Sequence, residues 1–326
     1  MARVFITRAV PGDSPALLAA AGHEARTWPG ELAPPPEALR EELQDAAAVM
    51  AMVTDRMDAA TFAAAPGLRI VANMAVGHDN VDPGVAAEAG VWLTNTPGVL
   101  AETTADHAFA LMLAAARHVG ASDRDTRAGG WRTWSPTAFL GHDVHGATLG
   151  IVGLGEIGSA VARRARGFAM HVLYHNRRPD AAAERALGVE YASLEDLLAA
   201  ADFVTIHAPL TAATRHLMGG PQFALMKPSA IFVNTARGGI VDQEALVEAL
   251  REGGIAGAAL DVTEPEPLPL GHPLFALPNV LITPHIASAS FATRARMAEM
   301  AARNIIVALA GERPPNAVNS PTNPRP

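Results

Sequence analysis

Gly153-Leu154-Gly155-Glu156-Ile157-Gly158 follows the apolar run Leu149-Gly150-Ile151-Val152 and opens a helical stretch that extends to about Phe168. In this G-x-G-x-x-G spacing the first glycine allows a tight turn, the second lets a pyrophosphate approach the backbone, and the third lets the helix pack on the strand. The helix N-terminus then faces the phosphates. The strand before the glycines and the helix after them predict a dinucleotide-binding βαβ unit, with cofactor contacts at Gly153, Leu154, Gly155, Glu156, Ile157 and Gly158.

Short β-branched runs alternate with alanine-rich helical stretches on both sides of this loop, which is typical of βαβ units and parallel sheets. The series before the loop predicts strands at residues 4–7, 48–53, 68–73 and 91–94. The series that starts at the loop predicts strands at residues 148–153, 171–176, 203–208, 230–236, 256–262 and 280–283. The predicted fold class is therefore α/β, with two doubly wound parallel-sheet domains, one flavodoxin-like and one of the Rossmann type.

The connections between the two series suggest where the domains divide. A helix is expected from Glu102 to about Gly120, and a last helix at 288–310 is expected to pack back on the first domain, because chain termini usually lie close together. We therefore expect a discontinuous substrate domain of residues 1–97 and 286–326, and a dinucleotide-binding domain of residues 98–285. The proline-rich tail from Arg313 is expected to be an extended strap or a frayed end.

Composition excludes several classes of protein. The 326 residues include no cysteine, so disulfides, thiolate metal sites and cysteine nucleophiles are ruled out. The formal net charge of −8, without clustered basic residues, argues against a nucleic-acid partner. The N-terminus lacks the apolar run of a secretory signal, and no stretch is long enough to span a bilayer, so we expect a cytoplasmic protein with no membrane partner.

The residues at the end of the second Rossmann strand bear on the choice of cofactor. NAD-binding sites usually carry an acidic residue about 20 positions after the first glycine, where it binds the ribose hydroxyls. Asn176, Arg177 and Arg178 stand there instead. Arginines attract the 2′-phosphate that a carboxylate would repel, so we expect NADP(H) to be preferred, with NAD(H) possible. The alternative is that both arginines are solvated loop charges.

Polar groups follow three late strands, at the edge where doubly wound folds place their chemistry. They are Arg237 in Asn234-Thr235-Ala236-Arg237-Gly238-Gly239, Glu266 in Asp261-Val262-Thr263-Glu264-Pro265-Glu266, and His285 in Thr283-Pro284-His285-Ile286. With the stretches 71–82, 94–100 and 102–106, these motifs make the chain resemble, over nearly its whole length, the D-isomer-specific 2-hydroxyacid dehydrogenases. Within that family the glyoxylate/hydroxypyruvate reductases are the most similar.

The resemblance implies a chemistry that these side chains suit independently. Reduction of a 2-oxo acid needs a cation for the carboxylate and an acid for the developing alkoxide. Arg237 supplies the fork-shaped cation, and His285 is the expected acid. Glu266, if hydrogen-bonded to His285, would favour the imidazolium and fix its orientation. The resemblance also makes the backbone at Val76 and Gly77 a second clamp on the substrate carboxylate.

The resemblance further assigns cofactor contacts, and leaves some alternatives open. Besides His285, the implied contacts are Thr104, Ala208, Pro209, Thr235, Ala236 and Asp261, of which Pro209 is equally explained as a loop stop. Asp261 would meet the nicotinamide amide, and since it ends an apolar strand we expect it to have a polar partner. Each of Trp131 and Trp134 is expected either at a neighbouring active site or buried in a dimer contact.

Three further expectations complete the prediction. His142 and His145 lack a clear third ligand, so we expect no metal. The long helix from Glu102 suggests a homodimer, as in the family that the chain resembles. The competing hypotheses are a dehydrogenase for lactate, a branched 2-oxo acid or phosphoglycerate, and a dinucleotide-sensing regulator without turnover; retention of Arg237, Glu266 and His285 argues against the regulator.

Overall fold

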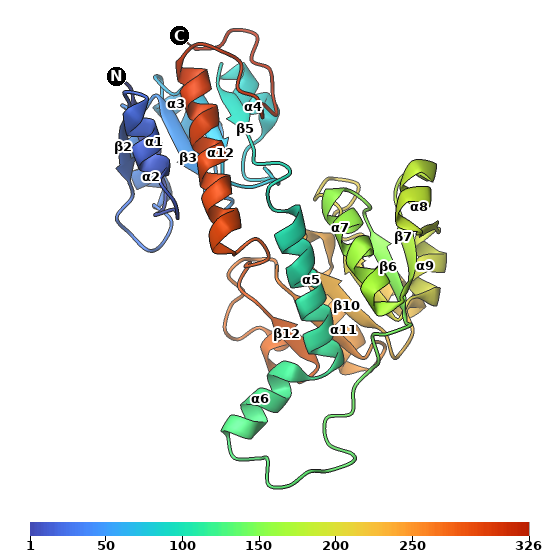
Figure 1. Cartoon of the computed structure of the whole chain (residues 1–326). Helices are drawn as coiled ribbons and strands as arrows, with labels where there is room; N and C mark the ends of the chain where they lie inside the picture. The colour runs from blue at the N-terminus through green and yellow to red at the C-terminus, as the bar shows by residue number, and fades with distance from the viewer. Residues whose placement is uncertain (326) are drawn as a thin grey trace. The chain divides into compact units, whose positions relative to one another are not determined.

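A computed structural model of the chain describes residues 1–325, and its contacts divide them into two units. Unit 1 comprises residues 1–100 together with the segment from Ala289, and unit 2 comprises residues 101–288. Each unit contains one fully parallel sheet with helices on both faces, which confirms the predicted α/β class with two doubly wound domains (Figure 1).

Unit 1 has a five-stranded sheet in the order β2-β1-β3-β4-β5. Its strands are β1 (Arg3–Ile6), β2 (Glu24–Thr27), β3 (Ala48–Ala51), β4 (Ile70–Asn73) and β5 (Trp92–Thr94). Its helices are α1 (Ser14–Ala20), α2 (Pro36–Leu43), α3 (Ala59–Ala64), α4 (Pro83–Glu88) and α12 (Phe291–Leu309). Figure 1 shows α12 beside α1, and α12 also contacts β3, β4 and β5. The predicted return of the last helix to the first sheet is thus observed.

The C-terminal tail is an extended strap along the edge strand β5. The backbone N–H of Val318 donates to the carbonyl of Leu93 at 2.8 Å, and the Asn319 side-chain oxygen accepts from the N–H of Leu93 at 2.8 Å. The guanidinium of Arg325 reaches the carbonyls of Ala65 and Leu68, which follow α3. These bonds satisfy backbone groups that an uncovered edge and a helix end would leave unpaired.

Unit 2 has a seven-stranded sheet in the order β12-β11-β10-β9-β6-β7-β8. Its strands are β6 (Thr148–Val152), β7 (His171–His175), β8 (Glu190–Tyr191), β9 (Phe203–Ile206), β10 (Ile231–Asn234), β11 (Gly257–Leu260) and β12 (Val280–Ile282). Its α-helices are α5 (Ala101–Ala116), α6 (Val119–Arg127), α7 (Glu156–Ala165), α8 (Ala181–Leu187), α9 (Leu194–Ala200), α10 (Gly220–Leu225) and α11 (Gln243–Arg251). Short 3-10 helices span Arg166–Phe168, Gly238–Ile240 and Pro273–Ala276.

Two apolar clusters hold the helices of unit 2 on its sheet. Side chains of α5 and α7 pack on one face, and those of α9, α10 and α11 pack on the other. Side chains cap two of these helices, since Ser193 accepts from the N–H of Asp196 and Asp242 accepts from the N–H groups of Glu244 and Ala245. These caps fix where α9 and α11 begin and therefore how the preceding loops leave the sheet.

The structure differs from the sequence prediction in three elements. Strands β2 and β8 were not predicted, because β2 has a half-exposed Glu-Ala-Arg-Thr sequence and β8 has only two residues. The single helix expected from Glu102 to about Gly120 is instead two helices, since His118 adopts a left-handed conformation at φ 53° and breaks the chain between α5 and α6. Within residues 1–325, no helix combines the length and the apolar character that crossing a bilayer requires.

Candidate active site and dinucleotide loop

The three glycines after β6 occupy positions that their spacing predicts. Gly153 has φ 99°, and a Cβ there would lie 2.6 Å from the backbone nitrogen of Ala208. A Cβ on Gly158 would lie 2.2 Å from the carbonyl oxygen of Gly153, so the third glycine lets α7 pack against the turn. At Gly155, the N-cap of α7, a Cβ would meet no atom within 4 Å. The backbone is therefore open at the residue where a pyrophosphate would approach the helix N-terminus.

Asn176 lies beside this loop, and its role is partly structural. Its side-chain oxygen accepts a hydrogen bond from the N–H of Leu154 at 2.8 Å, which ties the end of β7 to the glycine turn. Arg177 and Arg178 follow and are exposed. Neither arginine forms an ion pair with another residue of the described range 1–325. Both guanidinium groups are therefore available to an anionic ligand next to the glycine loop.

The turn after β10 presents another candidate cofactor contact. Asn234 is fully buried, accepts from the N–H of Ala236 at 3.0 Å and donates to the carbonyl of Arg237 at 2.9 Å. The hydroxyl of Thr235 is buried and has no hydrogen-bond partner within residues 1–325. A buried hydroxyl without a partner is costly, and a bound polar ligand would remove that cost. The chain therefore fits a dinucleotide at both the glycine loop and this turn.

The remaining predicted cofactor residues lie on neighbouring elements of unit 2. Thr104 is buried on α5. Ala208 and Pro209 follow β9 directly, and the carbonyl of Pro209 accepts from the hydroxyl of Thr214 at 2.6 Å. Since α5 packs on the sheet and β9 neighbours β6, these positions belong to the same domain as the glycine loop.

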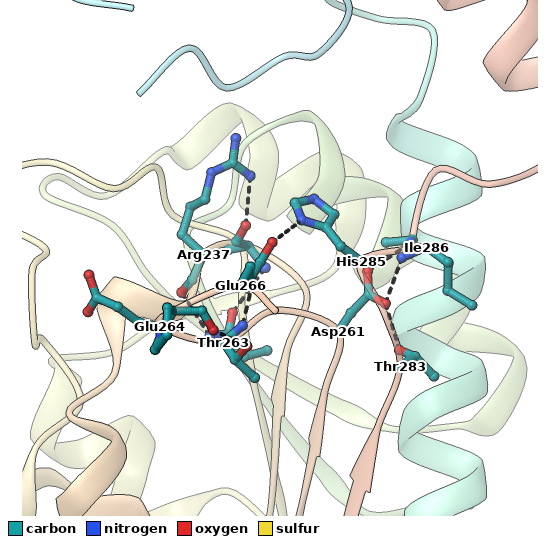
Figure 2. A network of polar contacts seen from close by, with 12 residues as sticks. Arg237, Asp261, Thr263, Glu264, Glu266, Thr283, His285 and Ile286 are labelled. Atoms are coloured by element: carbon teal, nitrogen blue, oxygen red, sulfur yellow. Dashed lines mark hydrogen bonds and ion pairs between the residues drawn. The ribbon is translucent and has the colours of Figure 1, made fainter. Parts of the chain in front are cut away.

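Arg237, Glu266 and His285 come from three loops at the carboxyl ends of β10, β11 and β12. His285 Nδ1 and Glu266 Oε2 are 2.7 Å apart, and both side chains are 30% exposed. The other carboxylate oxygen of Glu266 accepts from the N–H of Thr263 at 3.1 Å. Figure 2 shows the guanidinium of Arg237 and the ring of His285 extending to the same side of these loops. The pairing expected between Glu266 and His285 is present, and it directs Nε2 of the ring away from the glutamate.

Asp261 has the polar partners that its position predicts. Its side chain is inaccessible to solvent, and it accepts from the Thr283 hydroxyl at 2.6 Å and from the N–H groups of Ile286 and Ala287 at 2.9 and 2.8 Å (Figure 2). Burial alone would raise the pKa of Asp261, but hydrogen bonds from His107, Thr283 and these two amides hold the pKa below its usual value. Asp261 is therefore an ionised carboxylate built into the loop that carries His285.

In unit 1 the backbone at Val76 and Gly77 is held by two asparagines. Asn73 at the end of β4 donates to the carbonyl of Gly77 at 2.8 Å, and Asn95 after β5 donates to the carbonyl of Val76 at 2.9 Å. Within residues 1–325, the N–H groups of Val76 and Gly77 donate no hydrogen bond. Their carbonyls are fixed while their N–H groups remain able to bind an anion.

Several positioning residues escaped the sequence prediction: Asn73, Asn95, His107, Asn234, Gln243 and Thr283. They hold site loops through hydrogen bonds. For Asn73, Asn95, Asn234 and Thr283 the available signal was a polar residue at or just beyond the end of an apolar strand, whereas His107 and Gln243 lie on α5 and α11. Gln243 accepts from the N–H of Glu264 at 2.9 Å and donates to the carbonyl of the same residue, thereby anchoring the loop of Glu266. Only the tertiary structure shows which loop each such side chain reaches.

The two histidines considered as metal ligands line a surface pocket. His142 and His145 lie there with Asp143 and Asp202, and Asp202 is paired with Lys227 at 2.7 Å. In the described part of the chain, residues 1–325, no cluster of three or more histidine, aspartate or glutamate side chains is arranged to hold a metal ion.

Comparison with known proteins gives consistent relatives for both units. Residues 109–287 match the family model for the NAD-binding domain of D-isomer-specific 2-hydroxyacid dehydrogenases. A glyoxylate reductase of Korarchaeum cryptofilum is 53% identical over 321 residues, covering 97% of this chain and 96% of the relative. A crystal structure from Thermus thermophilus has a TM-score of 0.92 at 48% identity, covering 97% and 99% of the two chains. An NADPH-dependent glyoxylate/hydroxypyruvate reductase of Sinorhizobium meliloti, solved with NADP and malonate, has a TM-score of 0.86 at 30% identity, covering 99% and 98%.

Proposed function

Because this chain belongs to the D-isomer-specific 2-hydroxyacid dehydrogenases, we propose that it reduces glyoxylate or hydroxypyruvate to the D-2-hydroxy acid, using a nicotinamide dinucleotide. The observation that carries this proposal is the 2.7 Å hydrogen bond between His285 and Glu266, in loops that also present Arg237. The relatives named glyoxylate reductase and the NADPH-dependent neighbour support the choice of substrate.

Each side chain of the proposed site has a separate task. Arg237 binds the carboxylate and polarises the oxo group of the substrate through its planar, permanently charged fork. The N–H groups of Val76 and Gly77, in unit 1, are the other contacts proposed for a substrate carboxylate. The reduced nicotinamide, when bound, supplies the hydride. His285 in its protonated form donates from Nδ1 to Glu266 and delivers its Nε2 proton to the developing alkoxide, so that no free alkoxide accumulates.

Glu266 acts on the reaction through His285. Its carboxylate accepts a hydrogen bond from Nδ1–H, which fixes the orientation of the ring before proton transfer. The hydrogen bond from the Thr263 N–H to its second oxygen fixes the carboxylate in turn. The result is a proton donor that is oriented before substrate arrives, which is how an enzyme avoids reorganisation during the chemical step.

The function is tested by following NADPH oxidation with glyoxylate, hydroxypyruvate and a panel of larger 2-oxo acids. We expect the two small acids to have the highest kcat/KM. His285→Ala should lower kcat by about 10²- to 10⁴-fold, the usual contribution of a general acid. NADPH binding, measured by fluorescence titration, should remain largely intact, because the glycine loop and the other implied contacts still hold the cofactor. Wild-type NADPH binding without turnover on any 2-oxo acid would establish the sensor alternative instead.

We assign the preference for NADP(H) to Arg177 and Arg178. Both are exposed next to the glycine loop, and a 2′-phosphate would gain charge-assisted hydrogen bonds from them. The double variant Arg177→Ala/Arg178→Ala should raise the KM for NADPH by about tenfold or more, as expected for lost bonds to a charged group, and leave the KM for NADH unchanged. Arg185→Ala, an exposed arginine on α8, is the matched control and should alter neither constant. A wild-type preference for NADH contradicts this assignment.

We also propose that the chain forms a homodimer through residues 119–141. This segment contains α6, which has no buried residue, and Trp131 and Trp134, which are 73% and 79% exposed. Large aromatic side chains exposed together are typical of an interaction surface. Light scattering coupled to gel filtration should show a dimer for wild type and a monomer for Trp131→Ala/Trp134→Ala. A wild-type monomer at micromolar concentration would exclude the dimer.

A further inference from the structure

The backbone at His285 is held in a conformation that it would not adopt freely. Its φ is 55°, in the left-handed region, where a residue with a Cβ is disfavoured. Such a residue persists only when neighbouring bonds determine its conformation. The direction of the His285 side chain therefore depends on whatever fixes the loop from Thr283 to Ala287.

Asp261 supplies most of these bonds. Its backbone carbonyl accepts from the N–H of His285 at 2.9 Å, and its carboxylate accepts from the next two N–H groups, those of Ile286 and Ala287. Three consecutive backbone donors thus converge on one residue. A carboxylate that turns away would release two of them, and the left-handed turn would lose its support.

The buried carboxylate needs donors of its own to hold it, and α5 provides one. Nε2 of His107 lies 3.1 Å from the hydroxyl oxygen of Thr283 and 3.3 Å from Oδ1 of Asp261. The Thr283 hydroxyl donates to the same Oδ1 at 2.6 Å. The side chain of His107 is 18% exposed and that of Asp261 is inaccessible, so the contact between them is largely screened from water.

The geometry points to His107 as a positioning residue for His285. A donor on Nε2 of His107 orients Thr283 and Asp261, Asp261 holds the N–H groups on either side of the turn, and the turn aims the imidazole of His285. The inference rests on the proposed function only for its effect on turnover, because the restraint on the loop is a property of the protein without ligand. Through His107, α5 helps to orient His285 although His107 itself does not bind the substrate.

The test compares two pairs of variants. In each pair, one variant removes the hydrogen-bond donor and keeps a side chain of similar shape, and the other variant retains a donor. His107→Phe keeps a flat ring and removes the donor, whereas His107→Gln restores an N–H at a similar reach. Thr283→Val and Thr283→Ser make the same comparison at the second residue. His171→Phe, at an exposed position of β7, controls for the same substitution elsewhere in unit 2. The readouts are amide hydrogen exchange of Ile286 and Ala287 by NMR, and kcat with the KM values of both substrates.

We expect His107→Phe to accelerate exchange at Ile286 and Ala287 and to lower kcat, each on the order of tenfold, the effect of one lost hydrogen bond to a charged group. The dissociation constant of NADPH should change less than twofold, and His107→Gln should recover most of both losses. Exchange rates and kcat within twofold of wild type in His107→Phe would overturn the inference. Equal losses in His107→Phe and His107→Gln would also overturn it, because then ring packing alone would matter.

The design separates this inference from the function on which it partly rests. If the wild-type protein reduces no 2-oxo acid, the proposed function fails, while the exchange rates still decide whether His107 restrains the loop. If His107→Phe accelerates exchange throughout unit 2, the substitution has disturbed the whole unit and the pair at Thr283 decides instead. Thr283→Val should then accelerate exchange at Ile286 and Ala287 and lower kcat, and Thr283→Ser should recover most of both losses; equal losses in the two variants would overturn the inference.

Discussion

Acidification should destabilise unit 2 through the imidazole of His207, and the structure gives the size of the effect. His207 follows β9, donates its backbone N–H to Val152 at 2.8 Å and places Nε2 at 3.0 Å from the Thr205 hydroxyl. Burial lowers the pKa of His207 from 6.5 to about 3. The neutral ring is therefore retained in the folded protein under conditions in which the unfolded chain takes up a proton.

The sign follows from which state binds the proton more tightly. Since the folded pKa of His207 is lower than the unfolded one, stability is lost as pH falls below about 6.5, and the loss continues to about pH 3. Between pH 8 and pH 5 the unfolded state gains about 2 kcal/mol from this proton, while the folded state gains almost nothing. Other histidines add their own effects, so the prediction concerns the difference between wild type and His207→Gln.

The assay is urea unfolding of the intact chain at pH 8 and pH 5, followed by circular dichroism. If the two units unfold in separate transitions, the effect belongs to the transition of unit 2. Wild type should lose about 2 kcal/mol more stability between the two pH values than His207→Gln does. A difference below about 0.5 kcal/mol would refute the reasoning, because it would mean that the folded protein protonates His207 as readily as the unfolded chain.

Three further substitutions have expected outcomes. Gly155→Ala should weaken cofactor binding by tenfold or more, measured by titration, with little change in unfolding free energy, because its Cβ faces open space where phosphate would lie. Gly158→Ala should instead destabilise the protein by about 2 kcal/mol or more in urea unfolding, because its Cβ would lie 2.2 Å from a carbonyl oxygen. Arg325→Met should destabilise unit 1 by about 1–3 kcal/mol, since the carbonyls of Ala65 and Leu68 lose their donor; an unchanged melting temperature would show that the strap does not contribute.

The sequence predicted most of the fold because its strands are fully buried. Runs such as Ala-Val-Met-Ala in β3 and Ile-Phe-Val-Asn in β10 are apolar on both faces, which parallel strands between helix layers require. Strand β2 escaped because an edge strand exposes charged residues, here Glu24 and Arg26. The break at His118 escaped because nothing local in the sequence demands a left-handed residue there.

The candidate site was predictable where a motif carries its own geometry. The glycine loop is such a case, since each glycine is explained by one close approach or one open direction. The pairing of Glu266 with His285 was expected from motifs, and it is observed. The support from His107 was not predictable, because residues 107 and 261 are brought together only by the packing of α5 on β11. Similarly, the hydrogen bond from Leu154 to Asn176 adds a structural task to a residue considered for phosphate recognition.

The C-terminal strap and α12 determine the order in which the two units of a newly made chain can complete their folding. Unit 2 is continuous from Ala101 to Ser288, so all of its core is available before α12 has been synthesised. Unit 1 is different, because β4 packs against α12 and the edge strand β5 is paired by residues 317–319. The early strands of unit 1 therefore keep an uncovered face and an open edge until residues 291–319 have been synthesised. During that interval the uncovered face and the open edge are able to pair with other chains.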